Sequence, residues 1–208
     1  MKYLELSGIK AQTLFDNIQA KKFYMRLLEV DNNNDIEYKS DIQIKLCEVL
    51  QILGDWDECE KIIKEVIDSI KDVSEQKHDW ACGELGNLYL QKGSFDDALK
   101  LLLISKKSSK KYNNPVGEAK RSGQLGQLYL DTGKMDDASE SFDSQLKFYE
   151  GEKLYKYMPE ALQNIGVMHF RRGHLDKAYK CFEESSIGAQ KFNARYPQST
   201  ALGNMGLI

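Results

Sequence analysis

The stretch GELGNLYLQKGSFDDA, from Gly83 to Ala98, recurs as GQLGQLYLDTGKMDDA from Gly123 to Ala138. The two stretches are offset by 40 residues (123 − 83 = 40), and Gly173 continues the same step after Gly93 and Gly133. A repeat period of roughly 20–50 residues is typical of solenoids, in which identical supersecondary units stack on one another. The sequence therefore predicts a repeat protein.

Each repeat is expected to be a pair of helices. Four residues fall on one face of a helix, at offsets 0, 3, 4 and 7: Cys82, Leu85, Gly86 and Tyr89. Gly93 is expected to end this helix, and Asp96 and Asp97 to open a second helix at its positive end. Gly86 lies on the inward face, where we expect Ala98 of the second helix to come close. No strand is needed to account for the pattern.

The hairpin pattern resembles that of the tetratricopeptide repeat family. The matching positions are Leu125-Gly126, Tyr129, Gly133, Ala138 and Phe142. The 40-residue period is longer than the family's usual repeat of about 34 residues. Long repeats of this kind are similar to those of Pins-type spindle-orientation adaptors and kinesin light chains. The resemblance covers residues 40–190 and implies an all-α, right-handed α-solenoid of helix–turn–helix hairpins.

The resemblance also predicts how the chain is divided. We expect a single array over residues 1–208, with repeats at 40–78, 79–118, 119–158 and 159–198 and a truncated repeat at 199–208. Residues 1–39 are interpreted as a degenerate repeat, and the alternative is one long helix from about Gly8 to Val30. The segment 31–34 is predicted to be an open loop. The last repeat stops within its first helix, so we expect the sequence to be a fragment of a longer protein.

A second helical face is the candidate binding surface. In the tetratricopeptide family the first helices line a concave groove, and the resemblance implies that asparagines before the hydrophobic–small pair bind a peptide backbone. A carboxamide suits this role because it donates and accepts hydrogen bonds together. The residues predicted to line the groove, called the groove set below, are Trp80, Glu84, Asn87, Gln91, Lys120, Gln124, Gln127, Asp131, Asn164, Arg171 and Asn204.

Two alternatives remain open for this surface. The groove set could be a solvated face that binds nothing. The flanking glycines, Gly83, Gly123 and Gly203, could open floor space for a ligand or ease packing between neighbouring hairpins. Arg171 is expected to be able to pair with a carboxylate of the ligand, and Glu84 departs from the amide pattern.

Composition and motifs exclude several classes of function. The formal net charge of −3 argues against a nucleic-acid binder that works by bulk electrostatics. No apolar run approaches the roughly 18 residues that span a bilayer. No catalytic or phosphate-binding motif is found, and the three histidines do not cluster with other metal ligands, so we expect no catalytic residue, metal or cofactor. His169 takes the place of Tyr89 and Tyr129, which indicates a packing role.

The cysteines favour a reducing compartment. Cys47 and Cys59 fall where other repeats have Gly86 and Ala98, so they are expected to be small buried thiols in a cytoplasmic protein. The predicted function is a non-catalytic adaptor that binds a partner's peptide or helix in its groove. The alternative is a sensor or oligomerisation segment of a larger signalling enzyme or transcriptional regulator. The unfinished C-terminal end is also expected to self-associate.

Overall fold

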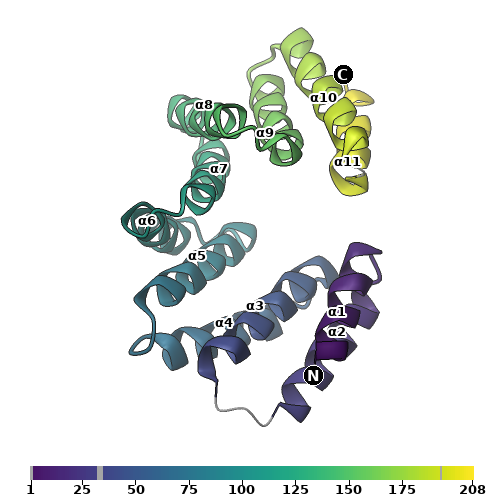
Figure 1. The fold of residues 1–208 in the computed structure, drawn as a ribbon. Helices are drawn as coiled ribbons and strands as arrows, with labels where there is room; N and C mark the ends of the chain where they lie inside the picture. The colour runs from purple at the N-terminus through teal and green to yellow at the C-terminus, as the bar shows by residue number, and fades with distance from the viewer. Residues whose placement is uncertain (1, 32–34, 193) are drawn as a thin grey trace. The chain divides into compact units, whose positions relative to one another are not determined.

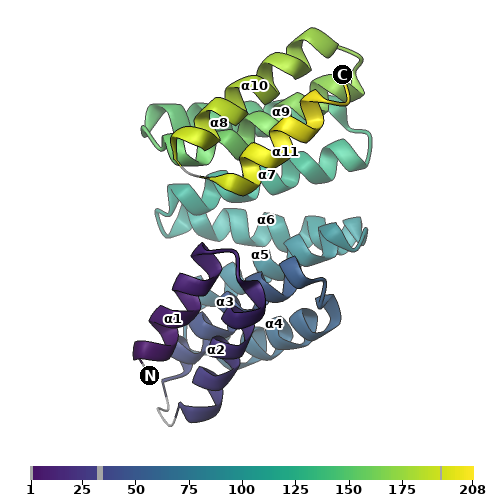
Figure 2. The same ribbon diagram turned by 90° about the vertical axis from the view of Figure 1, so that its right-hand side faces the viewer.

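The computed structural model describes residues 2–31, 35–192 and 194–208, which form α-helices joined by short turns and no strand (Figures 1 and 2). The predicted all-α fold of helix–turn–helix hairpins is confirmed. The chain divides into two compact units, Met1–Tyr112 and Asn113–Ile208. The predicted repeat boundaries stay a prediction, and most of the predicted open loop (residues 32–34) lies outside the described residues.

The first unit consists of six helices, each packed against the next along the chain. Their buried faces share a core that includes Tyr24, Leu27, Leu50 and Ile63, all with no exposed surface. The helices are α1 (Lys2–Thr13), α2 (Asn17–Val30), α3 (Ile36–Leu53), α4 (Trp56–Ile70), α5 (Glu75–Gln91) and α6 (Phe95–Lys111).

The second unit consists of five helices and a short 3₁₀ helix. Helix α9 contacts both α7 and α11, and the three lie on one side of this unit, with α8 and α10 on the other (Figure 1). Phe142, Phe182 and Met168 form much of the interior. The elements are α7 (Pro115–Asp131), α8 (Met135–Gly151), η1 (Tyr155–Tyr157), α9 (Met158–Arg171), α10 (Leu175–Lys191) and α11 (Arg195–Met205).

Turn glycines end the first helix of most hairpins, as predicted for Gly93. Gly93, Gly133 and Gly173 have φ values of 79°, 77° and 75°, in the left-handed region that favours glycine. The residue after each glycine donates its N–H to a carbonyl five positions earlier, as Lys134 does to Tyr129 at 2.8 Å. This bond satisfies a carbonyl that the helix end leaves unpaired.

The N-terminal hairpin shows that residues 8–30 do not form one long helix. Helices α1 and α2 are separated by a turn in which Phe15 adopts φ 61°. A non-glycine residue pays a steric cost in this conformation. Asp16 then caps α2 by accepting a hydrogen bond from the N–H of Gln19 at 3.1 Å. The alternative of a single helix is wrong, because turn and cap chemistry can occur without the glycine that marks the other turns.

The inner glycines make room for a ring of the second helix. A Cβ added to Gly126 would lie 2.6 Å from Cε1 of Phe142, and one added to Gly166 would lie 2.5 Å from Cε1 of Phe182. The sequence predicted that Ala98 would be the close neighbour of Gly86. The atoms nearest to a Cβ added at Gly86 belong to Leu101 and Leu102, three and four residues after Ala98, so two leucines fill the space that the missing side chain leaves.

This close contact predicts different costs for the same substitution at two helical glycines. Gly126→Leu should lower the free energy of unfolding by at least about 2 kcal/mol, because the new side chain would displace the buried Phe142 ring. The matched control is Gly151→Leu, since a Cβ at Gly151 meets nothing within 4 Å. Chemical denaturation of both variants checks the prediction, and equal midpoints would contradict it.

Candidate functional site

The groove set lies on the first helices of the hairpins, distributed over both compact units. Trp80, Glu84, Asn87 and Gln91 are on α5 in the first unit. The other members are on α7 (Lys120, Gln124, Gln127 and Asp131), on α9 (Asn164 and Arg171) and on α11 (Asn204), all in the second unit. Each unit therefore presents its own part of the predicted surface.

In the first unit two amide groups converge on one acceptor. Nδ2 of Asn87 donates to Oε1 of Gln51 at 3.3 Å, and Nε2 of Gln91 donates to the same oxygen at 3.5 Å. Gln51 belongs to α3 and was not predicted to be part of the surface. These contacts join two neighbouring hairpins and orient the carboxamides of α5.

Glu84 differs from the prediction that it lines an open groove. Its side chain belongs to the interior, with 4% of the residue exposed. Burying a carboxylate is unfavourable unless polar groups compensate its charge. Glu84 therefore offers little of its surface to a ligand.

In the second unit a buried arginine orients one member of the groove set. Arg121 on α7 has no exposed surface, and its guanidinium donates to Oε1 of Gln124 at 2.7 Å. On the same helix, Nε2 of Gln127 donates to Asp131 at 2.8 Å. The sequence did not distinguish Arg121 from an ordinary exposed arginine, because its helical position alone does not report how deeply a long side chain is buried.

Arg171 already has partners in the structure. Its guanidinium pairs with the carboxylate of Asp131 at 2.9 Å and donates to the carbonyl oxygen of Leu130 at 3.1 Å. These contacts join α9 to the end of α7. The sequence predicted that Arg171 could pair with a carboxylate of the ligand; such a ligand must share this guanidinium with Asp131 or displace it.

The flanking glycines of the groove set differ in what surrounds them. A Cβ added to Gly123 would lie 2.3 Å from Nε2 of Gln145 on α8, so this glycine eases packing between helices. A Cβ at Gly203 would meet nothing within 4 Å. Gly123 therefore eases packing within its own hairpin, and the predicted role in packing between hairpins stays a prediction, whereas at Gly203 the space in front of α11 is open.

Glu160 adds an acidic group to the same face of α9. Its side chain is accessible, yet the surrounding protein limits its solvation and raises the pKa of its carboxyl above the usual range. Lys120 on α7 opposes this effect through its positive charge.

A pocket of about 250 Å³ lies where α9 meets α11. We call it the α9–α11 pocket. Phe182 of α10 is almost fully buried, whereas Phe170 and Leu207 are exposed at 39% and 72%. Its lining residues are Val167, Phe170, Arg171, Phe182, Asn204 and Leu207. Two members of the groove set, Arg171 and Asn204, thus share one depression with four apolar side chains.

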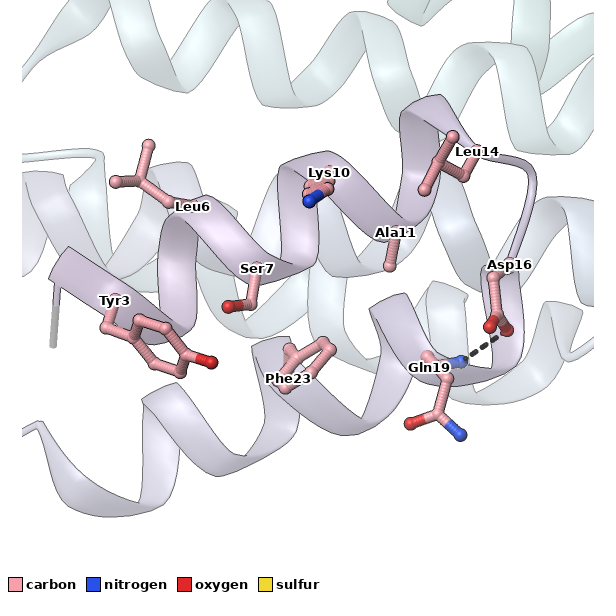
Figure 3. A pocket seen from close by; sticks show the side chains of 9 residues that line it. All are labelled: Tyr3, Leu6, Ser7, Lys10, Ala11, Leu14, Asp16, Gln19 and Phe23. Atoms are coloured by element: carbon pink, nitrogen blue, oxygen red, sulfur yellow. Dashed lines mark hydrogen bonds between the residues drawn. The ribbon is translucent and has the colours of Figure 1, made fainter.

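A second depression, of about 530 Å³, lies on the α1–α2 hairpin (Figure 3). Tyr3 and Leu6 of α1 and Leu14 of the following turn are more than half exposed there, and Phe23 of α2 lies beneath them. Its polar groups are few, and none belongs to the groove set. Sequence analysis did not predict this surface, because α1 lacks the residues that mark the other first helices.

Within residues 2–31, 35–192 and 194–208, no group of three or more histidine, cysteine or acidic side chains is arranged to hold a metal ion. The same residues contain no helix that is both long and apolar enough to cross a bilayer. His169 packs at the α9 position equivalent to Tyr129, with its ring 5.9 Å from that of His174.

The stacked hairpins, the left-handed turn glycines and the glycine–ring contacts define a class of α-helical repeat protein. Residues 119–150 match the tetratricopeptide repeat family. The chain carries a tetratricopeptide repeat and has the fold of tetratricopeptide repeat proteins, which confirms the resemblance inferred from the sequence. No curated protein sequence matches the chain.

Three solved structures illustrate the likeness in fold. The Rap conjugation gene regulator of plasmid pLS20, in complex with the Phr* peptide, has a TM-score of 0.83 and 14% identity, covering 96% of this chain and 56% of its own. A putative kinesin light chain from Podosopora anserina has a TM-score of 0.66 and 12% identity, and the match covers 93% of this chain and 96% of that protein. A signal transduction ATPase with a tetratricopeptide repeat sensor, from Pyrococcus horikoshii, has a TM-score of 0.73 and 16% identity. The match covers 97% of this chain and 31% of the ATPase.

The ring of His169 predicts a pH dependence of stability. Its Nδ1 is buried and has no hydrogen-bond partner among the described residues. Burial lowers the pKa of His169, and the charges of Lys177, His174 and Arg172 lower it further, against a smaller opposing effect of Asp143. The unfolded chain therefore binds this proton more readily, so stability is lost as pH falls through the unfolded pKa of about 6.5.

The control for this prediction comes from the chain's own repeats. His169→Tyr restores the residue found at positions 89 and 129, and it removes the titrating group. Melting temperatures measured between pH 7.5 and pH 5 should fall more for the original chain than for the variant. Parallel curves for the two proteins would show that His169 does not contribute.

Proposed function

We propose that the second unit binds a peptide segment of a partner protein across the exposed faces of α7, α9 and α11. The observation that carries this proposal is the α9–α11 pocket, which joins Arg171 and Asn204 of the groove set to a largely apolar wall. Peptide sites combine such apolar depressions with a few polar groups that fix orientation. A solvated face without function does not require this combination.

The polar groups suit an extended backbone. Asn164 on α9 and Asn204 on α11 are both partly exposed, and each carboxamide can accept from a peptide N–H and donate to a peptide carbonyl. The α9–α11 pocket is large enough for one bulky apolar side chain. The ligand class that best fits is therefore an extended peptide, bound through its backbone and anchored by one aliphatic or aromatic residue.

The structural comparisons support a peptide ligand. The Rap regulator of pLS20 was solved with a peptide bound, and its fold covers 96% of this chain. This chain spans 56% of that protein, so the regulator's other activities do not carry over. We place the activity in the cytoplasm and regard it as non-catalytic, since the four cysteines are free thiols and the proposed site relies on hydrogen bonds and apolar contact.

A second function is favoured by one comparison. The Pyrococcus horikoshii ATPase carries a tetratricopeptide repeat sensor, and this chain covers 31% of that protein. In this alternative the chain is the sensor or oligomerisation segment of a larger regulator, and the exposed Leu202 and Leu207 take part in self-association. Light scattering with and without a selected peptide separates the alternatives. The mass of an adaptor should rise only by the mass of the bound peptide, whereas an oligomerising sensor should change its number of subunits.

The amide contacts predict which substitutions weaken binding. Peptides selected from a displayed random library against the chain provide the ligand. Asn164→Ala should weaken their binding by about 1–3 kcal/mol, because a desolvated backbone group loses its partner. Gln190→Ala is the matched control, since Gln190 is an exposed carboxamide on α10, outside the groove set. Calorimetric titrations showing equal losses for both variants would contradict the proposed surface.

Filling the α9–α11 pocket should block the anchor residue. Val167 is partly exposed at the wall of the pocket, so Val167→Trp can occupy the space without entering the core. We expect at least a tenfold loss of peptide affinity, equivalent to about 1.4 kcal/mol, with an unchanged melting temperature. Unaltered affinity in this variant would place the peptide elsewhere, even if the Asn164 prediction holds.

A further inference from the structure

Two cysteines occupy a position that small residues fill in the other complete hairpins. On the first helix this position is a buried glycine, and on the second helix, 12 residues later, it is an alanine with no exposed surface. The glycine–alanine pairs are Gly8 and Ala20, Gly86 and Ala98, Gly126 and Ala138, and Gly166 and Ala178. In the α3–α4 hairpin the same positions hold Cys47 and Cys59. Two thiols therefore face each other within a tight helix pair.

The side chains of the two cysteines cross over one another. The thiol of Cys47 donates to the carbonyl oxygen of Cys59 at 3.6 Å, and the thiol of Cys59 donates to the carbonyl oxygen of Cys47 at the same distance. Each sulfur therefore reaches the backbone of the other residue. Both residues are buried, with 1% and 0% of their surface exposed. Side chains that cross in this way are directed at one another, as a disulfide requires.

The surroundings make the two thiols unequal. Hydrogen bonding with Cys47 lowers the pKa of Cys59, and the amide of Gln51, with Nε2 at 3.6 Å from Sγ, acts in the same direction. The same thiol–thiol contact and burial raise the pKa of Cys47. Cys59 is thus the thiol that ionises first. A thiolate is the nucleophilic form of cysteine.

We propose that Cys47 and Cys59 form a dithiol site that a hydroperoxide oxidises to an intramolecular disulfide. In the first step the sulfur of Cys59 attacks one peroxide oxygen and the O–O bond breaks. With hydrogen peroxide this gives a sulfenic acid and one water. In the second step the sulfur of Cys47 attacks the sulfenic sulfur, and its hydroxyl leaves as a second water. Two thiols lose two electrons, and one hydrogen peroxide becomes two waters.

The other two cysteines are not placed to compete within the fold. Cys82 lies on α5 and its thiol approaches the ring of His78 at 3.9 Å, whereas Cys181 lies on α10 of the second unit. Neither has a contact with a second cysteine sulfur among the described residues. A small uncharged oxidant is required at the α3–α4 site, because both sulfurs are buried.

The sequence permits a direct test with hydrogen peroxide on the folded chain. Both cysteines lie in one tryptic fragment, Leu46–Lys61, which contains no internal lysine or arginine. After peroxide treatment, unfolding and alkylation, we expect this fragment to carry no alkyl group and to weigh about 2 Da less than its reduced form. After further cleavage at Glu48 and Glu58, the two pieces that carry Cys47 and Cys59 should stay joined until the disulfide is reduced.

Two variants make the result decisive. Cys82→Ser/Cys181→Ser keeps only the proposed pair and should show the same loss of mass. Cys59→Ala restores the alanine found in the other hairpins and should leave Cys47 as an alkylatable thiol under the same treatment. Two alkylated thiols in the peroxide-treated chain, sulfinic acid in place of the disulfide, or a bond to Cys82 or Cys181 would each overturn the proposal.

Discussion

The fold depends on how closely the two helices of a hairpin can approach. At Gly126 and Gly166 the first helix lacks a side chain, and a phenyl ring from the second helix occupies the vacant space. A glycine within a helix costs about 1 kcal/mol relative to alanine. Burial of a full aromatic ring against the backbone more than offsets this cost. The contact also fixes the register of the two helices, because the ring can enter only where the glycine stands.

This packing determines which side chains are left for a ligand. Once Leu125, Gly126 and Tyr129 face the second helix, Gln124 and Gln127 are directed to other faces of α7. In the second unit α9 contacts both α7 and α11, so their remaining faces form a common surface. The α9–α11 pocket arises on this surface, with Phe182, the ring that packs against Gly166, contributing to its lining. The same aromatic residue therefore serves the core and the candidate site.

Features that repeat along the chain could be predicted from the sequence, whereas features that occur once could not. The hairpins and the turn glycines follow a fixed period, and periodicity reports one face of a helix directly. The turn at Phe15 has no glycine to mark it, and neither the rings that fill the space at Gly126 and Gly166 nor the leucines that fill it at Gly86 were predicted. Periodicity gives the face of a helix, but the depth of a contact depends on side-chain volumes in the neighbouring helix.

The candidate site also combines features that the sequence predicts with features that it does not. The sequence predicted one helical face for the groove set, but it did not predict the partners of these residues. Glu84 is buried, Gln124 is oriented by Arg121, and Arg171 is paired with Asp131, each through contacts that depend on side-chain conformation. Long polar side chains adopt many rotamers, so helical position alone does not determine where their charged ends lie.

The ion pair between Arg171 and Asp131 has a consequence for the mechanics of the second unit. It joins residues 40 positions apart in the sequence and links two successive first helices, α7 and α9. A ligand carboxylate that displaces Asp131 from Arg171 breaks this link. Binding of such a ligand therefore lowers the stiffness between α7 and α9. By reciprocity, stretching or bending that separates α7 from α9 increases the affinity for such a ligand. Binding of such a ligand and deformation of the second unit are thus thermodynamically coupled.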